Sequence, residues 1–353
     1  MSNMDLGFSE VQQTKRGRIS VDVALQKTYH LYDRNHVEKL RHILYAGQLR
    51  NPGDTAAVTW NWEQWWTYEG ISGPDFWGII NPDWSLCSKG RRQSPIDIDP
   101  ARLLYDPNLR LLHVDKHRVS GTLENTGHSV VLTLDTGKVP LNVTGGPLSY
   151  RYQLTEAHLH YGAVDLMGSE HTINGRAFPA EIQLFGFNSQ LYANFSQAID
   201  KAYGIVGISL LVKIGEVSNP ALTQLTEGTE KIKYFGSSHP IHRLSIHELL
   251  PETSYYMTYE GSTTMPACHE TVTWVITNKP IYITKKQLVT LREMTQGSKD
   301  AGPTPPPLSN NFRPPQKLHH RPVRTNIDFS NAGGTCPSMH REAYYKANTW
   351  TFS

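Results

Sequence analysis

The middle of this chain consists of short apolar or alternating runs separated by glycine, proline, asparagine and aspartate. Runs of this kind cover residues 129–134, 154–161, 181–187 and 272–277. Their length and two-residue period are typical of β-strands, and the separating residues favour turns. Between about residues 90 and 290 the chain is therefore predicted to be mostly β with short helices, and its strands must pair across long stretches of sequence.

Size and charge narrow the class of protein further. A chain of 353 residues can bury one large core, because all-β domains often run past roughly 200 residues as a single unit. The formal net charge of +2 argues against a partner chosen by bulk electrostatics, such as nucleic acid or an anionic membrane. The strongest apolar run, residues 204–212, is too short to span a bilayer and is typical of a buried strand.

The pattern predicts three segments. Residues 1–58 form a polar N-terminal extension, partly helical or disordered, in which residues 23–45 carry apolar side chains at helical intervals. A turn sequence at residues 51–54 ends this extension, and an aromatic-rich stretch opens the main domain, residues 59–331. Residues 332–353 form a polar C-terminal tail.

Two histidines are the first candidates for chemistry. Successive side chains of a strand point to opposite faces, so His158 and His160 share one face at a spacing that suits two ligands of a tetrahedral metal ion. On the next predicted strand, Glu181 and Gln183 share a face by the same period. A His-X-His pair alone is weak evidence, since such histidines are often structural, and a third ligand is still needed.

A series of motifs in fixed order extends the argument over residues 60–330. It comprises Trp66-Thr67-Tyr68, Gly73-Pro74, Arg92-Gln93-Ser94-Pro95-Ile96-Asp97-Ile98, Asn125-Thr126-Gly127-His128, Gly145-Gly146-Pro147-Leu148, Gly168-Ser169-Glu170-His171, Tyr259-Glu260-Gly261-Ser262, Val272-Thr273-Trp274 and Asn311-Phe312-Arg313-Pro314. Through these motifs the chain resembles the α-carbonic anhydrases. The resemblance implies a central, twisted, mainly antiparallel sheet with a conical cleft, and a zinc ion held at its floor by three histidines and a water molecule.

His158 and His160 match the first two zinc ligands of that family, but Gln183 stands at the position of the third. An amide oxygen is a neutral and poorer zinc ligand than imidazole. Losing a hydrogen-bond partner behind a ligand already weakens metal affinity by roughly 10- to 100-fold, so losing an imidazole ligand should cost at least as much. We expect no resident cofactor, with residual zinc binding left open.

Other residues match the apparatus around the metal. By resemblance, Thr264 orients a zinc-bound hydroxide, Glu170 accepts the proton of the Thr264 hydroxyl, Glu181 braces the third ligand, and His128 shuttles protons at the cleft mouth. Without an ion to lower the pKa of water from roughly 16 to about 7, these residues have no nucleophile to assist. The alternative is that Glu170, Thr264 and Glu181 form a buried hydrogen-bond network and that His128 is an ordinary exposed histidine.

The wall of the implied carbon dioxide pocket also departs from the family. Val272 and Trp274 match it, but Phe185 and Gly207 each stand where the catalytic members have valine, and Thr263 stands where they have leucine. We predict that the Phe185 ring occupies the space left at Gly207, an exchange that conserves core volume while closing the pocket.

Three features resemble the catalytically silent carbonic anhydrase-related proteins of the X and XI branch. They are Gln183, the run of residues 311–327 followed by Cys336, and the pair Cys87 and Cys268, which matches a disulfide of the secreted members. Members of that branch carry arginine at the position of His158. Loss of the metal in this chain would therefore rest on Gln183 alone.

The implied bridge also bears on the compartment, because a disulfide persists only where conditions are oxidising. With the glycosylation sequences at Asn142 and Asn194 it predicts a secreted protein, although no signal peptide is visible in residues 1–50; the alternative is a cytoplasmic protein. Cys336 is left over, which predicts either a free thiol or a disulfide-linked dimer.

Three functional hypotheses follow. The leading one is a catalytically inactive, secreted protein-binding module, since the resembled branch is neural and binds cell-surface receptors of the neurexin type. The second is a weakly active zinc-dependent hydratase of carbon dioxide that uses His158, His160 and Gln183. The third is a protein with neither role, whose surface mediates assembly inside the cell.

Overall fold

The computed structural model describes residues 66–135, 137, 139–300, 302 and 304–329. These residues all belong to the second of the two compact units into which the chain divides, Trp62–Ser353. The predicted N-terminal extension and C-terminal tail, with residues 23–45 and Cys336, lie outside the described residues, so their boundaries and roles stay predictions.

Strands make up most of the regular structure. They are β1 (Asp97–Ile98), β2 (Leu104–Tyr105), β3 (Leu112–Val114), β4 (Val119–Asn125), β5 (Val130–Asp135), β6 (Asn142–Gly145), β7 (Tyr152–Tyr161), β8 (Thr172–Ile173), β9 (Ala180–Asn188), β10 (Ile205–Ile214), β11 (Ser238–Leu244), β12 (Tyr256–Gly261), β13 (Val272–Thr277), β14 (Ile281–Ile283) and β15 (Arg324–Thr325). The helices are short: η1 (Gly70–Ser72), α3 (Trp77–Ile80), η2 (Pro82–Trp84), α4 (Leu86–Lys89), η3 (Pro100–Arg102), α5 (Phe195–Ala198), α6 (Pro220–Thr229), α7 (Ile246–Leu249) and α8 (Lys285–Arg292).

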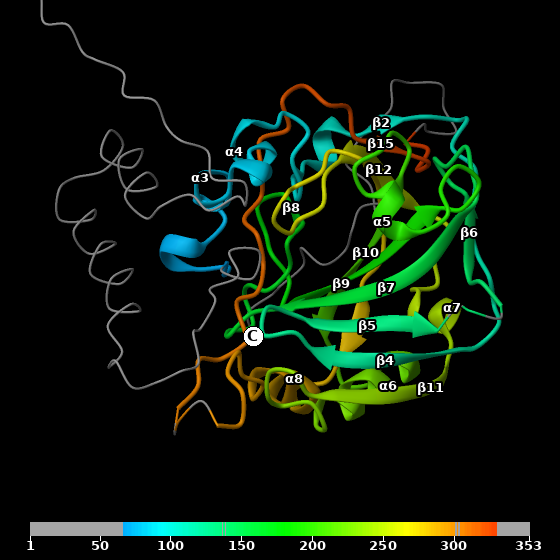
Figure 1. Ribbon diagram of the computed structural model, residues 1–353. Coiled ribbons are helices and arrows are strands. Elements are labelled where there is room, and N and C mark those ends of the chain that lie inside the picture. Colours follow the sequence, from blue (N-terminus) through cyan, green and yellow to red (C-terminus); the bar gives the residue numbers. More distant parts are fainter. Residues whose placement is uncertain (1–65, 136, 138, 301, 303, 330–353) are drawn as a thin grey trace, which may run out of the picture. The chain divides into compact units, whose positions relative to one another are not determined.

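One large sheet dominates the described residues (Figure 1). Its main path runs β11-β4-β5-β7-β9-β10-β13-β12-β15-β2, and β3, β6 and β14 join it off that path. Neighbours in this sheet are antiparallel except where β10 meets β13 and β14 and where β15 meets β2. The predicted mostly β fold is confirmed, and four of the predicted strands correspond to β5, β7, β9 and β13.

The two longest helices, α6 and α8, have starts that the sequence encodes. The side chain of Asn219 accepts hydrogen bonds from the first turn of α6, and Pro220 follows at a position where its missing N–H costs nothing. Thr284 and Gln287 form a reciprocal capping box at the start of α8. Both helices then place leucines against the sheet.

The central strands are buried on both faces, and each face has its own apolar core. On one face, Leu184 of β9 and Leu210 of β10 pack in a cluster that includes Leu225 of α6 and Leu291 of α8. On the other face, Phe185 belongs to a second cluster with residues of β10, β12 and β13. Because side chains alternate along a strand, the odd-numbered residues of β9 share the face that carries Phe185.

A third apolar cluster packs the short helices of residues 77–89 against the loop that contains Cys268. It contains Trp77, Trp84, Cys87 and Cys268, all buried. A disulfide joins Cys87 of α4 to Cys268 in the loop before β13, with an S–S distance of 2.02 Å across 181 residues of sequence. The bridge predicted from the family resemblance is confirmed.

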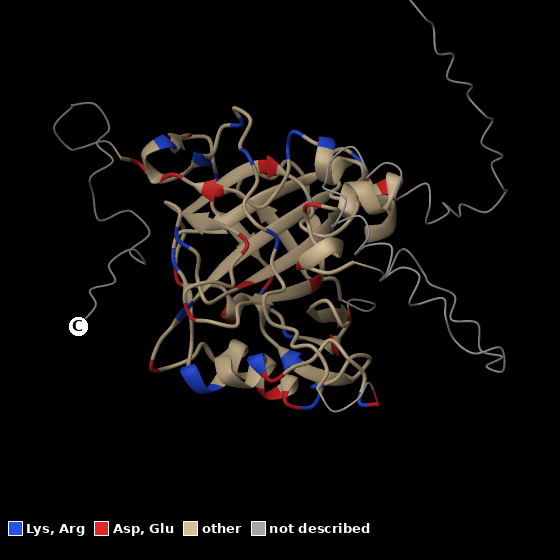
Figure 2. Cartoon of the chain, turned by 90° about the vertical axis from the view of Figure 1, so that its left-hand side faces the viewer, with Lys and Arg blue, Asp and Glu red and all other residues tan. Residues whose placement is uncertain are grey.

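The surface carries charges of both signs. Basic and acidic residues are interspersed over the side of the molecule shown in Figure 2. Among the described residues, we find no helix with the length and apolar composition needed to cross a bilayer. The prediction that nucleic acid is not a partner is untested.

The disulfide should be a major contributor to stability. Replacing both cysteines (Cys87→Ser with Cys268→Ser) should lower the free energy of unfolding by roughly 2–5 kcal/mol, because the unfolded chain would lose a constraint on a long loop. Urea unfolding of the oxidised protein, the reduced protein and the double variant measures this effect. The reduced protein is the control and should match the variant; a variant as stable as the oxidised protein would contradict the prediction.

Candidate functional site

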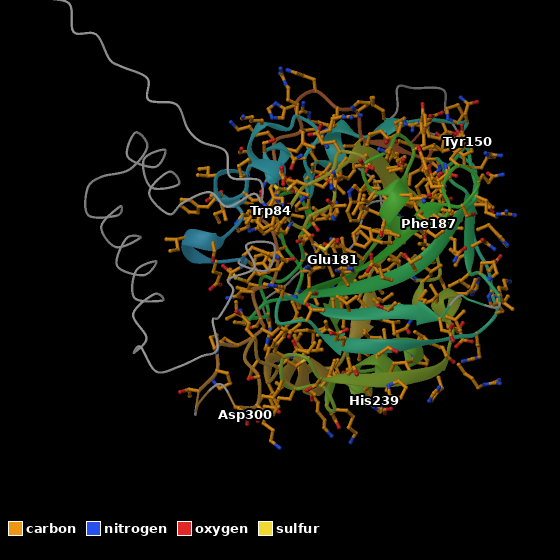
Figure 3. All side chains as sticks on the ribbon, in the orientation of Figure 1. Trp84, Tyr150, Glu181, Phe187, His239 and Asp300 are labelled. Atoms are coloured by element: carbon orange, nitrogen blue, oxygen red, sulfur yellow. A yellow bond between two sulfur atoms is a disulfide. The ribbon has the colours of Figure 1, made fainter. Side chains whose placement is uncertain are left out.

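The sheet register gathers the predicted site residues on one face. In the antiparallel pair of β7 and β9, His158 lies opposite Gln183 and His160 lies opposite Glu181. Strand β10 adds Ser209, which lies opposite Gln183 on the other side. All five side chains are more than nine-tenths buried. Figure 3 places Glu181 among the central strands, well away from His239 near the edge of the sheet.

Gln183 is held at both ends of its amide. Its Nε2 donates to Oε2 of Glu170 at 2.7 Å and to Oε1 of Glu181 at 2.9 Å. Its Oε1 accepts a hydrogen bond from the hydroxyl of Thr264 at 3.3 Å. Ionised carboxylates only accept hydrogen bonds, so the two glutamates fix which end of the amide faces them.

Glu181 is the most heavily bonded group of the site. Its Oε2 accepts from the backbone N–H groups of Glu170 and His171, and its Oε1 accepts from the His171 imidazole, the Gln183 amide and the Ser209 hydroxyl, all within 2.9 Å. Burial raises the pKa of the Glu181 carboxyl, but the charge and hydrogen bonds of His171 and the bond from Gln183 outweigh it and lower this pKa to about 2. Glu181 is therefore an ionised, fully buried carboxylate.

The network continues from His171 towards the start of the domain. The Nε2 of His171 lies 2.8 Å from the hydroxyl of Tyr259, which donates to the hydroxyl of Ser94 at 2.8 Å. Ser94 also accepts from the backbone N–H of Ser262. The sequence motifs contain His171, Tyr259, Ser94 and Ser262. The sequence alone could not predict that His171 and Ser209 contact Glu181, because these contacts depend on how distant strands align.

Glu170 and Thr264 meet Gln183 rather than each other. The Glu170 carboxylate accepts from Gln183 through Oε2 and from the backbone N–H of Arg313 through Oε1 at 2.8 Å. The Thr264 hydroxyl donates to Gln183, whereas the family resemblance implied that it donates to Glu170. The amide accounts for this difference, because it offers an acceptor to Thr264 and a donor to Glu170 at the same time.

His160 is oriented by the chain near Asn311. Its Nδ1 lies 2.7 Å from the Asn311 carbonyl oxygen, which requires an N–H at Nδ1 that donates to it. The other nitrogen, Nε2, is buried and has no hydrogen-bond partner in the described part of the chain. Nε2 is thus the atom of His160 that is available to a metal ion.

His158 is turned towards a residue that the sequence analysis did not single out. Its Nε2 lies 3.3 Å from Oε2 of Glu156, two residues earlier on β7, but the alignment is too poor for a hydrogen bond, so the contact is an ion pair when His158 is protonated. Burial raises the pKa of Glu156, but the neighbouring His158 outweighs this and holds that pKa below its usual value. The two-residue period of β7 was the signal that could have found Glu156.

The donor set fits zinc poorly. It consists of two imidazoles and one amide oxygen, and that oxygen already accepts a hydrogen bond from Thr264. Among the described residues, no three histidine, cysteine, aspartate or glutamate side chains are grouped so as to hold a metal ion. The buried Nε2 of His160 and the two ring nitrogens of His158, which have no hydrogen-bond partner in the described part of the chain, are the features that suit a metal there. The expected absence of a resident cofactor stays a prediction.

Gly207 lies between Phe185 of β9 and Trp274 of β13 in the sheet register. A Cβ added at Gly207 would lie 2.8 Å from two ring carbons of Trp274, so the Trp274 indole covers this glycine. The Phe185 ring packs beside the indole, with centroids 5.5 Å apart, and meets the His158 ring edge-on at 5.3 Å. The register pairs Gly207 with both aromatic residues, so the filling of the Gly207 space by the Phe185 ring stays a prediction. Val272 and Thr263 are buried.

His128 lies outside this buried network. Its ring stacks on the Trp66 indole with centroids 4.0 Å apart and planes 12° apart. The side chain is half-buried. Its role as a proton shuttle stays a prediction.

The two glycosylation sequences differ in their surroundings. The amide nitrogen of Asn142, on β6, donates to Asp115 at 2.9 Å and to the carbonyl of Pro140 at 3.2 Å. Asn194 is exposed and caps α5 through its oxygen, and its amide nitrogen has no hydrogen bond to the described residues. The Asn194 nitrogen is therefore the more accessible attachment point.

A large, mainly antiparallel sheet that carries His158 and His160 on one buried face defines the carbonic anhydrase class of fold and site. Comparison with known proteins agrees: residues 72–327 match the model of the eukaryotic-type carbonic anhydrases, and the chain belongs to this family. It is similar to putative carbonic anhydrase-like protein 2 of Caenorhabditis elegans, with 43% identity over 291 residues that cover 80% of this chain and 86% of the relative.

The low pKa of Glu181 makes a prediction about acid stability. A carboxyl whose folded pKa lies below its unfolded value stabilises the fold above the unfolded pKa, and this contribution is lost as the pH falls through the folded pKa. The free energy of unfolding should therefore fall between about pH 5 and pH 2. The contribution of Glu181 to that fall is about 3 kcal/mol, given a pKa of about 2 in place of 4.5.

Urea unfolding of Glu181→Gln at several pH values in this range tests it. This variant should be less stable but should show a shallower pH dependence, because its side chain does not titrate. Glu216→Gln, which changes an exposed glutamate, is the control and should keep the steep dependence of the unmodified protein. Equal slopes for Glu181→Gln and the unmodified protein would contradict the assignment.

Proposed function

We propose that this chain is a catalytically inactive carbonic anhydrase-like protein of the X and XI branch that acts as a secreted protein-binding module, a neural ligand of neurexin-like cell-surface receptors. The observation that carries the proposal is the amide of Gln183, which is bonded to Glu170, Glu181 and Thr264. The choice of receptor rests on the family resemblance described above.

The argument for inactivity is that these partners satisfy one another without a cation. The amide nitrogen donates to two buried carboxylates, which also accept from backbone N–H groups, from His171 and from Ser209. A zinc ion here would bind an amide oxygen, which is a weaker ligand than the imidazole at this position in the catalytic members. The ion would also compete with Thr264 for that oxygen. His158 would also have to turn its Nε2 away from Glu156.

The argument for secretion rests on the disulfide between Cys87 and Cys268, because reducing compartments do not maintain such bonds. The proposed binding role uses the surface of this disulfide-closed domain. A disulfide-linked dimer through Cys336 belongs to the same proposal.

A second candidate function is slow, zinc-dependent hydration of carbon dioxide. It is favoured by the ring nitrogens of His158 and the Nε2 of His160, which are buried without hydrogen-bond partners in the described part of the chain. Each such group costs roughly 1–3 kcal/mol unless a water molecule or metal ion satisfies it. Stopped-flow hydration assays with and without a sulfonamide discriminate the two functions, and sulfonamide-sensitive turnover would overturn the first.

Restoring the missing imidazole tests the account of the metal centre. Gln183→His should raise zinc affinity by at least about 10-fold, while hydration stays slow because the Phe185 ring, at a position where the catalytic members have valine, still obstructs the pocket. Isothermal titration with zinc and stopped-flow hydration measure these effects.

Gln197→His is the matched control, because it adds a histidine at an exposed position of α5 and should leave zinc affinity unchanged. Full hydration activity from Gln183→His alone would show that the pocket wall does not obstruct the substrate. No gain in zinc affinity would show that the third ligand is not what limits metal binding.

Glycosylation tests the proposed compartment. Protein recovered from the medium of secreting cells should carry a glycan at Asn194 in preference to Asn142, because the Asn194 amide nitrogen is accessible whereas that of Asn142 is bonded to Asp115. Peptide mass spectrometry before and after glycosidase treatment locates the glycan, with Asn194→Gln as the control. Secreted protein that lacks a glycan at Asn194 would contradict the prediction.

A further inference from the structure

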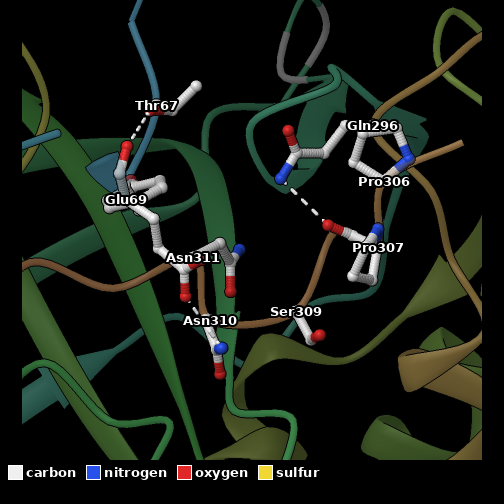
Figure 4. A pocket seen from close by; sticks show the side chains of 9 residues that line it. Thr67, Glu69, Gln296, Pro306, Pro307, Ser309, Asn310 and Asn311 are labelled. Atoms are coloured by element: carbon white, nitrogen blue, oxygen red, sulfur yellow. Dashed lines mark hydrogen bonds between the residues drawn. The ribbon is translucent and has the colours of Figure 1, made fainter. Parts of the chain in front are cut away.

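A cavity of about 210 Å³ lies beside the candidate site and has no role in the account above (Figure 4). Tyr68, Pro306 and Pro307 supply its apolar lining. Its polar lining includes Glu69, Gln296 and Ser309. Binding sites for drug-sized molecules usually exceed roughly 300 Å³, so a cavity of this size suits one side chain or a similarly small group.

The cavity shares a wall with the buried network. Asn311 lines it, and the carbonyl of Asn311 holds the Nδ1 of His160. Tyr68 lines it too, and the Tyr68 ring meets the His160 ring edge-on with centroids 6.2 Å apart. A group bound in this cavity would therefore lie beyond the Asn311 carbonyl that holds Nδ1 of His160, and not at the Nε2 available to a metal ion.

Several polar groups of the lining have bonding capacity to spare. One carboxylate oxygen of Glu69 accepts from the Asn310 amide at 2.9 Å, and the other makes no hydrogen bond to the described residues. The hydroxyl of Ser309, a residue only 9% exposed, also has no hydrogen-bond partner among them. The Gln296 amide donates to the Pro307 carbonyl at 2.9 Å, which leaves the Gln296 side-chain oxygen unused.

The unused groups define the chemistry of a ligand. Those that are not fully buried comprise one carboxylate oxygen, one amide oxygen and one hydroxyl; the Tyr68 hydroxyl also has no partner among the described residues but is fully buried. The cavity lining contains no lysine, arginine or histidine. Such a set favours a cation that donates hydrogen bonds. An ammonium group has three N–H donors for three such oxygens, and its alkyl stem suits walls made of proline and tyrosine rings.

We propose that this cavity binds an alkyl ammonium group and that its occupant is a lysine side chain of the protein partner. The choice of a protein side chain over a free amine rests on the proposed binding function. Glu69 supplies the charge, Ser309 and Gln296 supply further acceptors, and the rings of Tyr68 and Pro307 contact the stem.

The test uses the full chain labelled with nitrogen-15 and n-butylammonium chloride as the probe, read by amide chemical shifts. The probe should produce saturable shifts at Glu69, Ser309 and Asn310. Uncharged n-butanol of similar length should produce none of these shifts at the same concentrations. Glu69→Gln should weaken n-butylammonium binding by about 3- to 10-fold, as expected for a partly exposed charge pair with hydrogen bonds.

Glu69 is exposed, so Glu69→Gln should keep the fold, and an unchanged thermal midpoint checks this. Glu216→Gln, at an exposed site elsewhere, should bind the probe like the unmodified protein. The proposal is overturned by the absence of saturable shifts, by equal binding of n-butanol, or by unchanged affinity in Glu69→Gln. Zinc content and hydration test the proposed function separately, so either idea can fail alone.

Discussion

The hydrogen bonds from the Gln183 amide to the carboxylates of Glu170 and Glu181 are the interaction on which the centre of this structure depends. Two buried carboxylates this close together need donors, and the amide supplies one to each while its oxygen accepts from Thr264. In the α-carbonic anhydrases an imidazole at this position links the protein to a metal ion. Here the same position closes a hydrogen-bond network.

The other donors of that network come from the backbone and from neighbouring strands. Ser209 on β10, His171 and the backbone N–H of Arg313 all serve the same two carboxylates. The face of the sheet that would hold the cleft floor is thus tied to the loops around it. We infer that a chain of this family can keep its architecture for a binding role after the third imidazole is lost.

Local pattern predicted much of the fold, since the two-residue period located β5, β7, β9 and β13. The motifs predicted the bridge between Cys87 and Cys268, which no spacing rule could have paired. The indole of Trp274 over Gly207 escaped prediction because it depends on the register between strands. A slip of one residue between β10 and β13 would send Trp274 and the Gly207 position to opposite faces of the sheet. The contact of Glu156 with His158 lies within one strand, where the two-residue period could have predicted it.

Metal analysis of the purified protein tests the central claim most directly. Protein secreted by cells in ordinary medium and purified without chelators should contain far less than stoichiometric zinc, and brief dialysis should remove what is present. Stoichiometric zinc that survives dialysis against a chelator would show that His158, His160 and Gln183 hold a metal ion, and would contradict the account.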